Sequence, residues 1–228
     1  GGGGGGGSSA PTPAPIVDSA VGGIWEGTTT LTDGTKYETA GFITEAGELR
    51  FITEDGAQQV GTISSTGSVI NGEVTEYTAI ADPVSGTFTG TISARNTLSG
   101  SVQFGGVTTS TFSFNYDTLY ERDSSLAVVS GIYSDTDGGG YTETYTIESD
   151  GTITGSDTDG CVFGGAVSIL DSNYNMYRVQ LTVSNCDDLD GTYTGLGALS
   201  DTNGSKNDTF IISLTGPAYV ITGFVPRV

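Results

Sequence analysis

The stretch "GTFTGTIS" at residues 86–93 alternates apolar and polar side chains with a period of two. Phe88 and Ile92 fall on one face, and the Thr and Ser residues between them fall on the other. Successive side chains of a β-strand point to opposite faces of the sheet, so this alternation predicts a strand with one buried face.

The same pattern continues along the chain in both directions. It recurs in "LSGSVQF" at 98–104, in "TSTFSFNY" at 109–116 and in "RVQLTVS" at 178–184. Short runs of Gly, Asp and Asn, such as "EDGA" at 54–57, separate these stretches and are typical of tight turns between antiparallel strands. The sequence therefore predicts an all-β protein built as two tandem antiparallel β-barrel or β-sandwich units.

Two halves of the chain share four landmarks in the same order, which suggests a duplication. The pairs are Gly23-Ile24-Trp25 with Gly131-Ile132-Tyr133, "GTIS" at 61–64 with "GTIT" at 151–154, "GTFTG" at 86–90 with "GTYTG" at 191–195, and "STFSF" at 110–114 with "DTFII" at 208–212. We therefore expect a first unit at 16–118 and a second unit at 119–228, preceded by a tether at 1–15.

The stretch "RDSSLAVVSG" at 122–131 predicts a short helical turn that joins the two units. Asp123 or Ser124 is expected to cap its N-terminus, and Gly131 to stop it. Leu126 and Val129 share one face of this turn.

The charge balance excludes some classes of partner. The 228 residues include 27 acidic and 7 basic residues, for a net charge of −20. Such a field repels nucleic acid and anionic membrane surfaces, so we expect no nucleic-acid binding. No apolar run approaches the roughly 18 to 20 residues of a membrane-spanning helix, so any membrane contact is expected through a lipid anchor only.

The chain contains no His, which removes the commonest general base and the Ser-His-Asp and Cys-His forms of catalysis. Carboxylate chemistry remains open, but the spacing selects no acid and base pair among the acidic residues. We expect a protein that is not an enzyme and needs no cofactor.

Cys161 and Cys186 are the only cysteines, and neither belongs to a Cys-x-x-Cys motif. We expect a structural disulfide that staples neighbouring strands of the second unit. Closing a loop of about 26 residues stabilises a fold by roughly 3 to 4 kcal/mol in the chain-entropy model, and it implies an oxidising compartment.

Two acidic turns, "SDTDG" at 134–138 and again at 156–160, offer two interpretations. Asp and Gly are what a hairpin turn requires, because both tolerate left-handed backbone angles. Calcium is the alternative, because Asp-x-Asp-Gly can supply carboxylate and carbonyl oxygens. The ligands would then be Asp135, Asp137, Asp157 and Asp159.

The opening "GGGGGGGSSAPTPAP" reads as a flexible glycine segment followed by a stiffer, proline-spaced one. It resembles the mature start of bacterial outer-membrane and surface lipoproteins that carry a glycine tract and small β-barrels. The resemblance implies a lipid-anchored protein at the outer membrane or cell surface, or an extracellular one. A linker added for expression, and a segment that becomes ordered in an assembly, are the alternatives.

Gly23-x-Trp25 resembles the Gly-x-Trp entry of lipocalin barrels, in which the Trp plugs one end and an Arg packs over it. The resemblance implies Trp25 as a barrel plug beside a ligand, with Tyr133 in the same place in the second unit and Arg122 as a partner. The alternative is that both are ordinary core aromatics.

These features favour a non-enzymatic envelope lipoprotein that binds or scaffolds a membrane or surface protein. One alternative is a subunit of an extracellular filament, in which the N-terminal segment pairs with an open sheet edge in another copy. A second is a carrier with a small apolar ligand inside one barrel.

Overall fold

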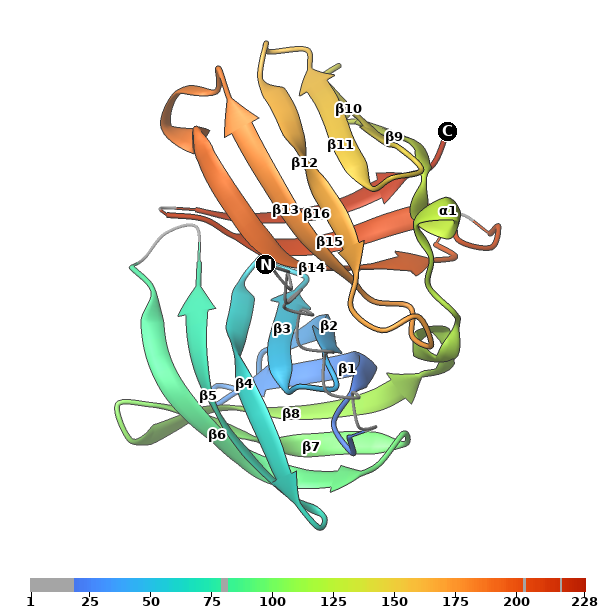
Figure 1. Ribbon diagram of the computed structural model, residues 1–228. Coiled ribbons are helices and arrows are strands. Elements are labelled where there is room, and N and C mark those ends of the chain that lie inside the picture. The colour runs from blue at the N-terminus through green and yellow to red at the C-terminus, as the bar shows by residue number, and fades with distance from the viewer. Residues whose placement is uncertain (1–18, 79–81, 203, 218) are drawn as a thin grey trace, which may run out of the picture.

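The computed structural model describes residues 19–78, 82–202, 204–217 and 219–228. The chain forms two eight-stranded antiparallel sheets in tandem, joined by short helical turns (Figure 1). This confirms the predicted all-β class and the tandem arrangement. The tether predicted at 1–15 lies outside the described residues.

The first sheet is a closed barrel, because each strand pairs with the next and β8 pairs back with β1. Phe88 and Ile92 of β6 are buried inside it, as the alternation predicted. The strands are β1 (Gly23–Leu31), β2 (Lys36–Ile43), β3 (Glu48–Thr53), β4 (Gln58–Thr66), β5 (Val69–Tyr77), β6 (Val84–Ser93), β7 (Thr97–Phe104) and β8 (Val107–Asp117).

The second sheet curls in the same way, but its edge strands β9 and β16 meet only at one bridge, between Tyr133 and Arg227. A short turn, η2 (Asp187–Leu189), follows its fifth strand. The strands are β9 (Gly131–Thr136), β10 (Thr142–Ile147), β11 (Thr152–Asp157), β12 (Val162–Ile169), β13 (Tyr177–Ser184), β14 (Gly191–Ser200), β15 (Thr209–Thr215) and β16 (Val220–Pro226).

Between the sheets the chain forms η1 (Thr118–Glu121) and α1 (Leu126–Val129). The residue that caps α1 is Ser125, whose side chain accepts a 3.1 Å hydrogen bond from the Val128 N–H. The prediction of Asp123 or Ser124 as the cap was wrong, because the Ser124 hydroxyl donates to the Asp171 carbonyl instead. Leu126 and Val129, which were predicted to share a face, both pack on the core of the second barrel.

Two of the four landmarks of the predicted repeat fall on equivalent strands. Gly23-Ile24-Trp25 and Gly131-Ile132-Tyr133 open the first strand of each sheet, and 86–90 and 191–195 lie on the sixth strands, β6 and β14. The other two pairs fall on strands whose positions in the two sheets differ by one. These are the fourth strand β4 against the third strand β11, and the eighth strand β8 against the seventh strand β15. Gly/Thr motifs recur on many strands of this chain, so their resemblance alone does not fix equivalence.

Geometry gives a closer equivalence at the turn before the third strand of each sheet. Gly47 and Gly151 have φ angles of 84° and 88°. Their carbonyls accept hydrogen bonds from the N–H groups of Ile63 and Val167, at 2.8 and 2.7 Å. A Cβ at either glycine would lie 2.3 Å from the carbonyl oxygen of that same neighbour. Both the backbone angle and the close approach therefore require glycine.

Candidate functional site

A third apolar cluster, separate from the two barrel cores, lies between the barrels. It joins outward-facing residues of β1 and β2 to the linker and to the outer face of the second barrel. Its buried members are Ile24, Phe42, Tyr120, Tyr174, Met176, Leu196 and Ala198. Because this cluster buries apolar side chains from both units against one another, it favours one arrangement of the two units.

An ion-pair network crosses the same interface. Arg178 of the second barrel donates to both carboxylate oxygens of Glu48, at 2.9 and 2.6 Å, and Arg50 donates to Glu48 at 3.2 Å. Arg50 also donates to the Ser213 carbonyl, and the Ser213 hydroxyl donates to Gln58 at 2.8 Å. Burial by itself would raise the pKa of Glu48, but Arg178 and Arg50 lower it overall. Glu48 is therefore held ionised between two cations.

The linker contributes a second set of contacts. The Tyr120 ring stacks on Tyr174 with centroids 4.5 Å apart, and its hydroxyl donates to Glu45 at 2.8 Å. Arg122 binds Asp201 through two hydrogen bonds of 2.7 and 2.6 Å. Linker and barrels are thereby tied together by both apolar and charged groups.

All five arginines of this acidic chain bind groups within the molecule. Arg50 and Arg178 cross the interface, and Arg95 donates to Tyr174 at 2.9 Å. Arg122 holds the linker, and Arg227 lies 5.1 Å from the centre of the Tyr133 ring. Sequence reasoning singled out only Arg122 among them, and for another role. The scarcity of basic residues in so acidic a chain could have pointed to the other four.

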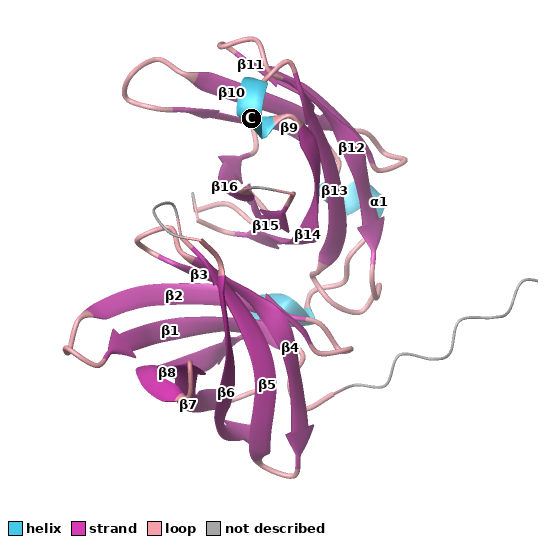
Figure 2. Ribbon diagram, turned by 90° about the vertical axis from the view of Figure 1, so that its left-hand side faces the viewer, coloured by secondary structure: helices cyan, strands magenta, loops and turns pink. Residues whose placement is uncertain are grey.

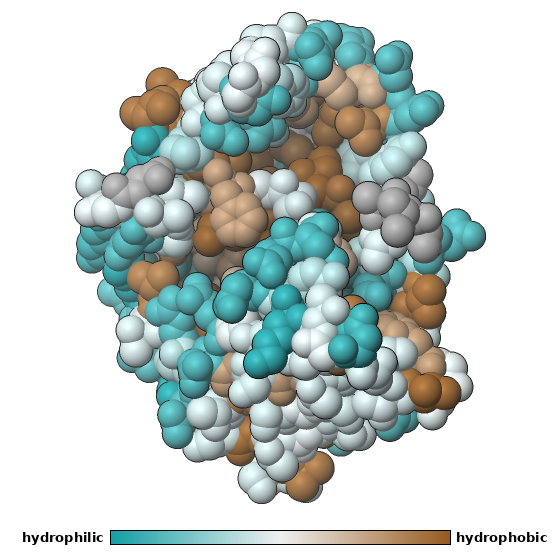
Figure 3. Space-filling model, turned by 180° about the vertical axis from the view of Figure 1, so that it is seen from behind, coloured by the Kyte–Doolittle hydropathy of each residue, from teal (hydrophilic) through white to brown (hydrophobic). Residues whose placement is uncertain are grey.

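The second sheet remains open along β16 beyond its bridge to β9. Val228 donates to the Ile132 carbonyl at 2.9 Å, and Arg227 bridges Tyr133. The next residue along β16 is Pro226, which has no N–H to extend the ladder. No described strand pairs with the outer edge of β16 before that point. Figure 2 shows the second sheet as a C-shaped ring with a gap between β9 and β16. Figure 3 looks into this gap and shows apolar side chains inside it.

The backbone geometry identifies the residues that form the free edge. Arg227 donates to Asp208 and Gly216 donates to Tyr219, so odd-numbered residues of β16 bond to β15. In an antiparallel pair the alternate residues direct their N–H and C=O groups to the other side. Along the open edge, Val220, Thr222 and Phe224 therefore present backbone groups that no described strand pairs with.

A groove of about 410 Å³ separates β16 from β1, β2 and β3 of the first barrel. The aromatic ring of Phe224, half exposed, and the side chains of Ala40 and Ile52 form its apolar part. Its lining residues are Glu26, Gly27, Glu38, Thr39, Ala40, Ile52, Thr53, Glu54, Gly56, Thr222 and Phe224. The groove thus continues the interface at the point where the two barrels diverge.

Three carboxylates, and no Lys or Arg, line this groove. The N–H of Glu54 donates to the Glu38 carbonyl at 2.9 Å, which places the two residues side by side on neighbouring strands. Although Glu26 reaches solvent, partial burial raises its pKa, and the charge of Asp117 raises it further. Lys36, on the same face of β2 as Glu38, forms no described salt bridge with any of the three. The groove is therefore a region of uncompensated negative charge.

Trp25 and Tyr133 lie in the two barrel cores, with 0% and 1% of their surface exposed. Each donates to the carbonyl of the valine four residues before it: Trp25 to Val21 at 3.1 Å, and Tyr133 to Val129 at 2.7 Å. Arg122, the predicted partner of Trp25, binds Asp201 instead. In the second barrel an arginine does pack on the equivalent aromatic residue, because Arg227 lies over the Tyr133 ring.

Small spaces lie inside each barrel. The one in the second barrel has a volume of about 30 Å³ and is bordered by Tyr133, Phe210 and Val225, and the one in the first has about 20 Å³. Each is large enough for about one water molecule, which needs roughly 10 to 15 Å³ of such space. A carrier of small apolar ligands needs an interior of several hundred cubic ångströms, so neither space supports that alternative.

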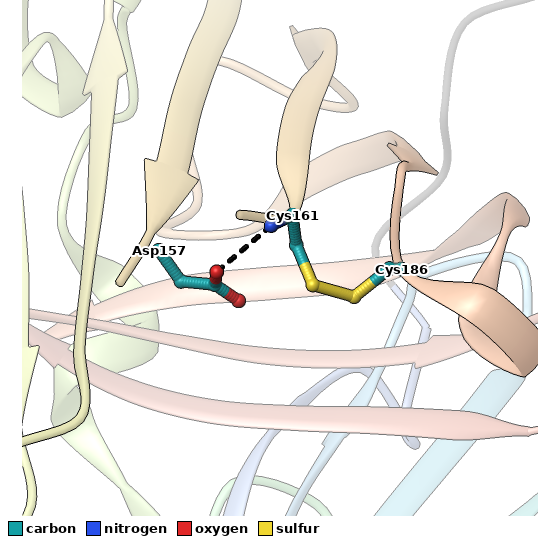
Figure 4. Close-up of side chains that lie close together, drawn as sticks. All are labelled: Asp157, Cys161 and Cys186. Carbon is teal, nitrogen blue, oxygen red and sulfur yellow. Dashed lines mark hydrogen bonds between the residues drawn. A yellow bond between two sulfur atoms is a disulfide. The ribbon is translucent and has the colours of Figure 1, made fainter. Parts of the chain in front are cut away.

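The predicted disulfide is present. Cys161 and Cys186 are bonded, with Cα atoms 4.8 Å apart, and they join the start of β12 to the end of β13 (Figure 4). Asp157 lies close to both cysteines, so the three residues together have side chains of the kinds that bind metals. Sulfur atoms in a disulfide are not thiolate ligands, however, so this cluster does not form a metal site while the bond is intact.

The carboxylates of the acidic turns accept backbone hydrogen bonds. Asp157 Oδ1 accepts from Asp159 and from Cys161, both at 2.9 Å, and Asp137 Oδ1 accepts from Gly139 and Tyr141 at 2.8 and 3.0 Å. These are the contacts expected of Asp in a tight turn. Asp135 lies on β9 and Asp159 is exposed at the turn, so the four predicted ligands do not form one described cluster.

The chain matches no known family, and neither a curated protein nor a solved structure is similar to it at a significant level. None of the helices in the described ranges has the length and apolar character needed to cross a membrane. The choice of the groove beside β16 as the candidate site therefore rests on its geometry and charge alone.

Proposed function

We propose that this protein is a non-enzymatic binding module of the bacterial cell envelope, whose partner is a membrane or surface protein. The observation that carries the proposal is the groove between Phe224 on the open edge of β16 and the first barrel. Binding sites commonly lie where two domains meet, and an unpaired strand edge offers main-chain hydrogen bonds to an extended partner.

The inter-barrel contacts support this proposal, because a site formed by two units needs both in a fixed arrangement. The apolar cluster around Tyr120 and the Glu48–Arg178 pair supply that arrangement. The disulfide supports an oxidising compartment, since such bonds persist outside the reducing cytoplasm. The glycine tract supports a lipid anchor, which intact-mass analysis of protein from the native envelope would test.

The test of binding is site-specific photo-crosslinking in the native bacterium. A photoreactive amino acid replaces Thr222 in the groove or, as a matched control, the exposed Thr89 on β6. We expect a discrete adduct from position 222 and none of the same mass from position 89. Identical patterns from the two positions, or no adduct from either, would contradict the proposal.

The filament alternative is favoured by the same free edge of β16, which could accept residues 1–15 of another copy. Those residues carry no charged side chain to complement the groove. An adduct with the mass of a dimer, lost on deletion of residues 1–15, would favour this alternative over a separate partner.

A further inference from the structure

We propose that the groove beside β16 binds an extended segment of another protein in which cationic and apolar side chains alternate. This inference rests on the proposed function and specifies the chemistry of the partner. The occupant would add a strand to the second sheet at its open edge.

The length of the free edge sets the length of the segment. The outer edge of β16 from Val220 to Val225 has no described partner strand, and Pro226 ends it on the side of β9. At about 3.3 Å per residue, these six residues span about 20 Å, so the segment would be about six residues long.

The two faces of β16 determine which side chains should alternate along the bound segment. Val225 and Ile221 point into the core of the second barrel, whereas Thr222 and Phe224 face the groove. A strand added beside β16 shares these two faces. Alternate residues of the bound segment would therefore meet the apolar core at the open side, and the residues between them would face the first barrel.

The side chains of the first barrel determine the charge expected of the bound segment. Glu26, Glu38 and Glu54 line the groove and form no salt bridge with a described basic residue, and the arginines of the chain are engaged elsewhere. Like charges on neighbouring strands repel, and a cationic side chain placed between them relieves that repulsion. Lys or Arg on the outward face of the segment fits this surface, whereas another copy of a chain with a net charge of −20 is repelled by it.

The experiment measures fluorescence anisotropy of labelled ten-residue peptides with the full chain at about 150 mM salt, where exposed charges farther apart than about 8 Å are largely screened. The probes are an alternating Lys–Val peptide, a peptide of the same composition with Lys and Val in separate blocks, an alternating Glu–Val peptide, and residues 1–15 of this chain. We expect saturable binding of the alternating Lys–Val peptide, with the block peptide at least about fivefold weaker, because only alternation places every Lys on one face of a strand.

Two variants test the site from its opposite walls. Thr222→Pro removes one outward N–H from the edge, and proline is tolerated on edge strands. Glu38→Lys with Glu54→Lys reverses two groove charges. Each is expected to weaken the alternating Lys–Val peptide about tenfold, the size of loss expected when an edge hydrogen bond or two exposed charge contacts are removed.

A matched control reverses the same number of charges elsewhere. Glu73→Lys with Glu148→Lys changes two exposed residues outside the groove and is expected to alter affinity less than about twofold. Circular dichroism of each variant checks that the fold is kept. If Thr222→Pro does not fold, the Glu38 and Glu54 variant, on the other barrel, decides the outcome.

Other outcomes would overturn the inference, and one would overturn only the proposed function. Equal binding of the Glu–Val peptide, or equal loss in the control variant, would contradict a cationic partner at this groove. Tighter binding of residues 1–15 would assign the edge to another copy. An adduct at position 222 without Lys–Val binding would leave the proposed function standing and refute this inference, whereas Lys–Val binding without an adduct would refute the proposed function.

Discussion

The two barrels have the same eight-stranded order but reach stability by different means. The first closes through the ladder between β1 and β8 and contains no disulfide. In the second, no described strand pairs with most of the β9 and β16 edges, and the sheet instead has a disulfide at one end and Arg227 on Tyr133 at the other. Covalent and charged contacts can therefore hold an open sheet in shape, and this leaves an edge free for binding.

Removal of the disulfide should have the largest effect on the difference in stability between the two barrels. Cys161→Ser with Cys186→Ser should lower the free energy of unfolding of the second barrel by about 3 to 4 kcal/mol in the chain-entropy model. With the bond intact we expect the first barrel to show faster amide hydrogen exchange, and without it the second. Better protection of the first barrel in the intact protein would contradict the first expectation.

Substitution of the equivalent glycines should affect both barrels alike. Gly47→Ala and Gly151→Ala each place a Cβ 2.3 Å from a carbonyl oxygen at a positive φ, so each should lose about 2 to 3 kcal/mol in denaturant unfolding. Gly34→Ala is the control, because its φ is 90° but no atom lies within 4 Å of the added Cβ. It should lose only about 1 kcal/mol. Equal losses at all three positions would refute the role of the close contact.

Arg227→Ala should loosen the contact between β9 and β16 in the second barrel and leave the first barrel unchanged. It removes the hydrogen bonds from Arg227 to the Val128 carbonyl and the Tyr133 hydroxyl, and the contact with the Tyr133 ring. We expect a loss of about 1 to 2 kcal/mol and faster exchange of the Val228 N–H, which donates to Ile132. Tyr133→Phe keeps the ring and should have a smaller effect. Unchanged exchange at Val228 would show that Arg227 does not hold the two edges together.

The smallest expected effect concerns acid stability. The Arg122 hydrogen bonds lower the pKa of Asp201 from 3.8 to about 2. Because the folded pKa is the lower one, this stabilisation is present above about pH 4 and is lost as the pH falls towards 2. Asp201 is partly exposed, so the contribution should be less than about 1 kcal/mol. Asp201→Asn should remove this part of the acid dependence, and an unchanged profile in acid unfolding would contradict the assignment.

Local sequence determined the strands and the disulfide. The alternation in "GTFTGTIS" places Phe88 and Ile92 inside the first barrel, because a pleated strand directs alternate side chains to opposite faces. Cys161 and Cys186 were each other's only available partner in the chain. The start of α1 could not be located as closely, because Asp123, Ser124 and Ser125 are all suitable caps. In the structure Ser125 accepts from the Val128 N–H, whereas the Ser124 hydroxyl donates to the Asp171 carbonyl.

Tertiary structure alone decided the groove. Glu38 and Phe224 are far apart in the sequence, and nothing in their local patterns distinguishes them from other exposed residues. They come together because the apolar cluster around Tyr120 and the Glu48–Arg178 pair set the arrangement of the barrels. Strand alternation is a property of neighbouring residues, whereas closure of a sheet and the packing of two barrels depend on contacts between distant parts of the chain.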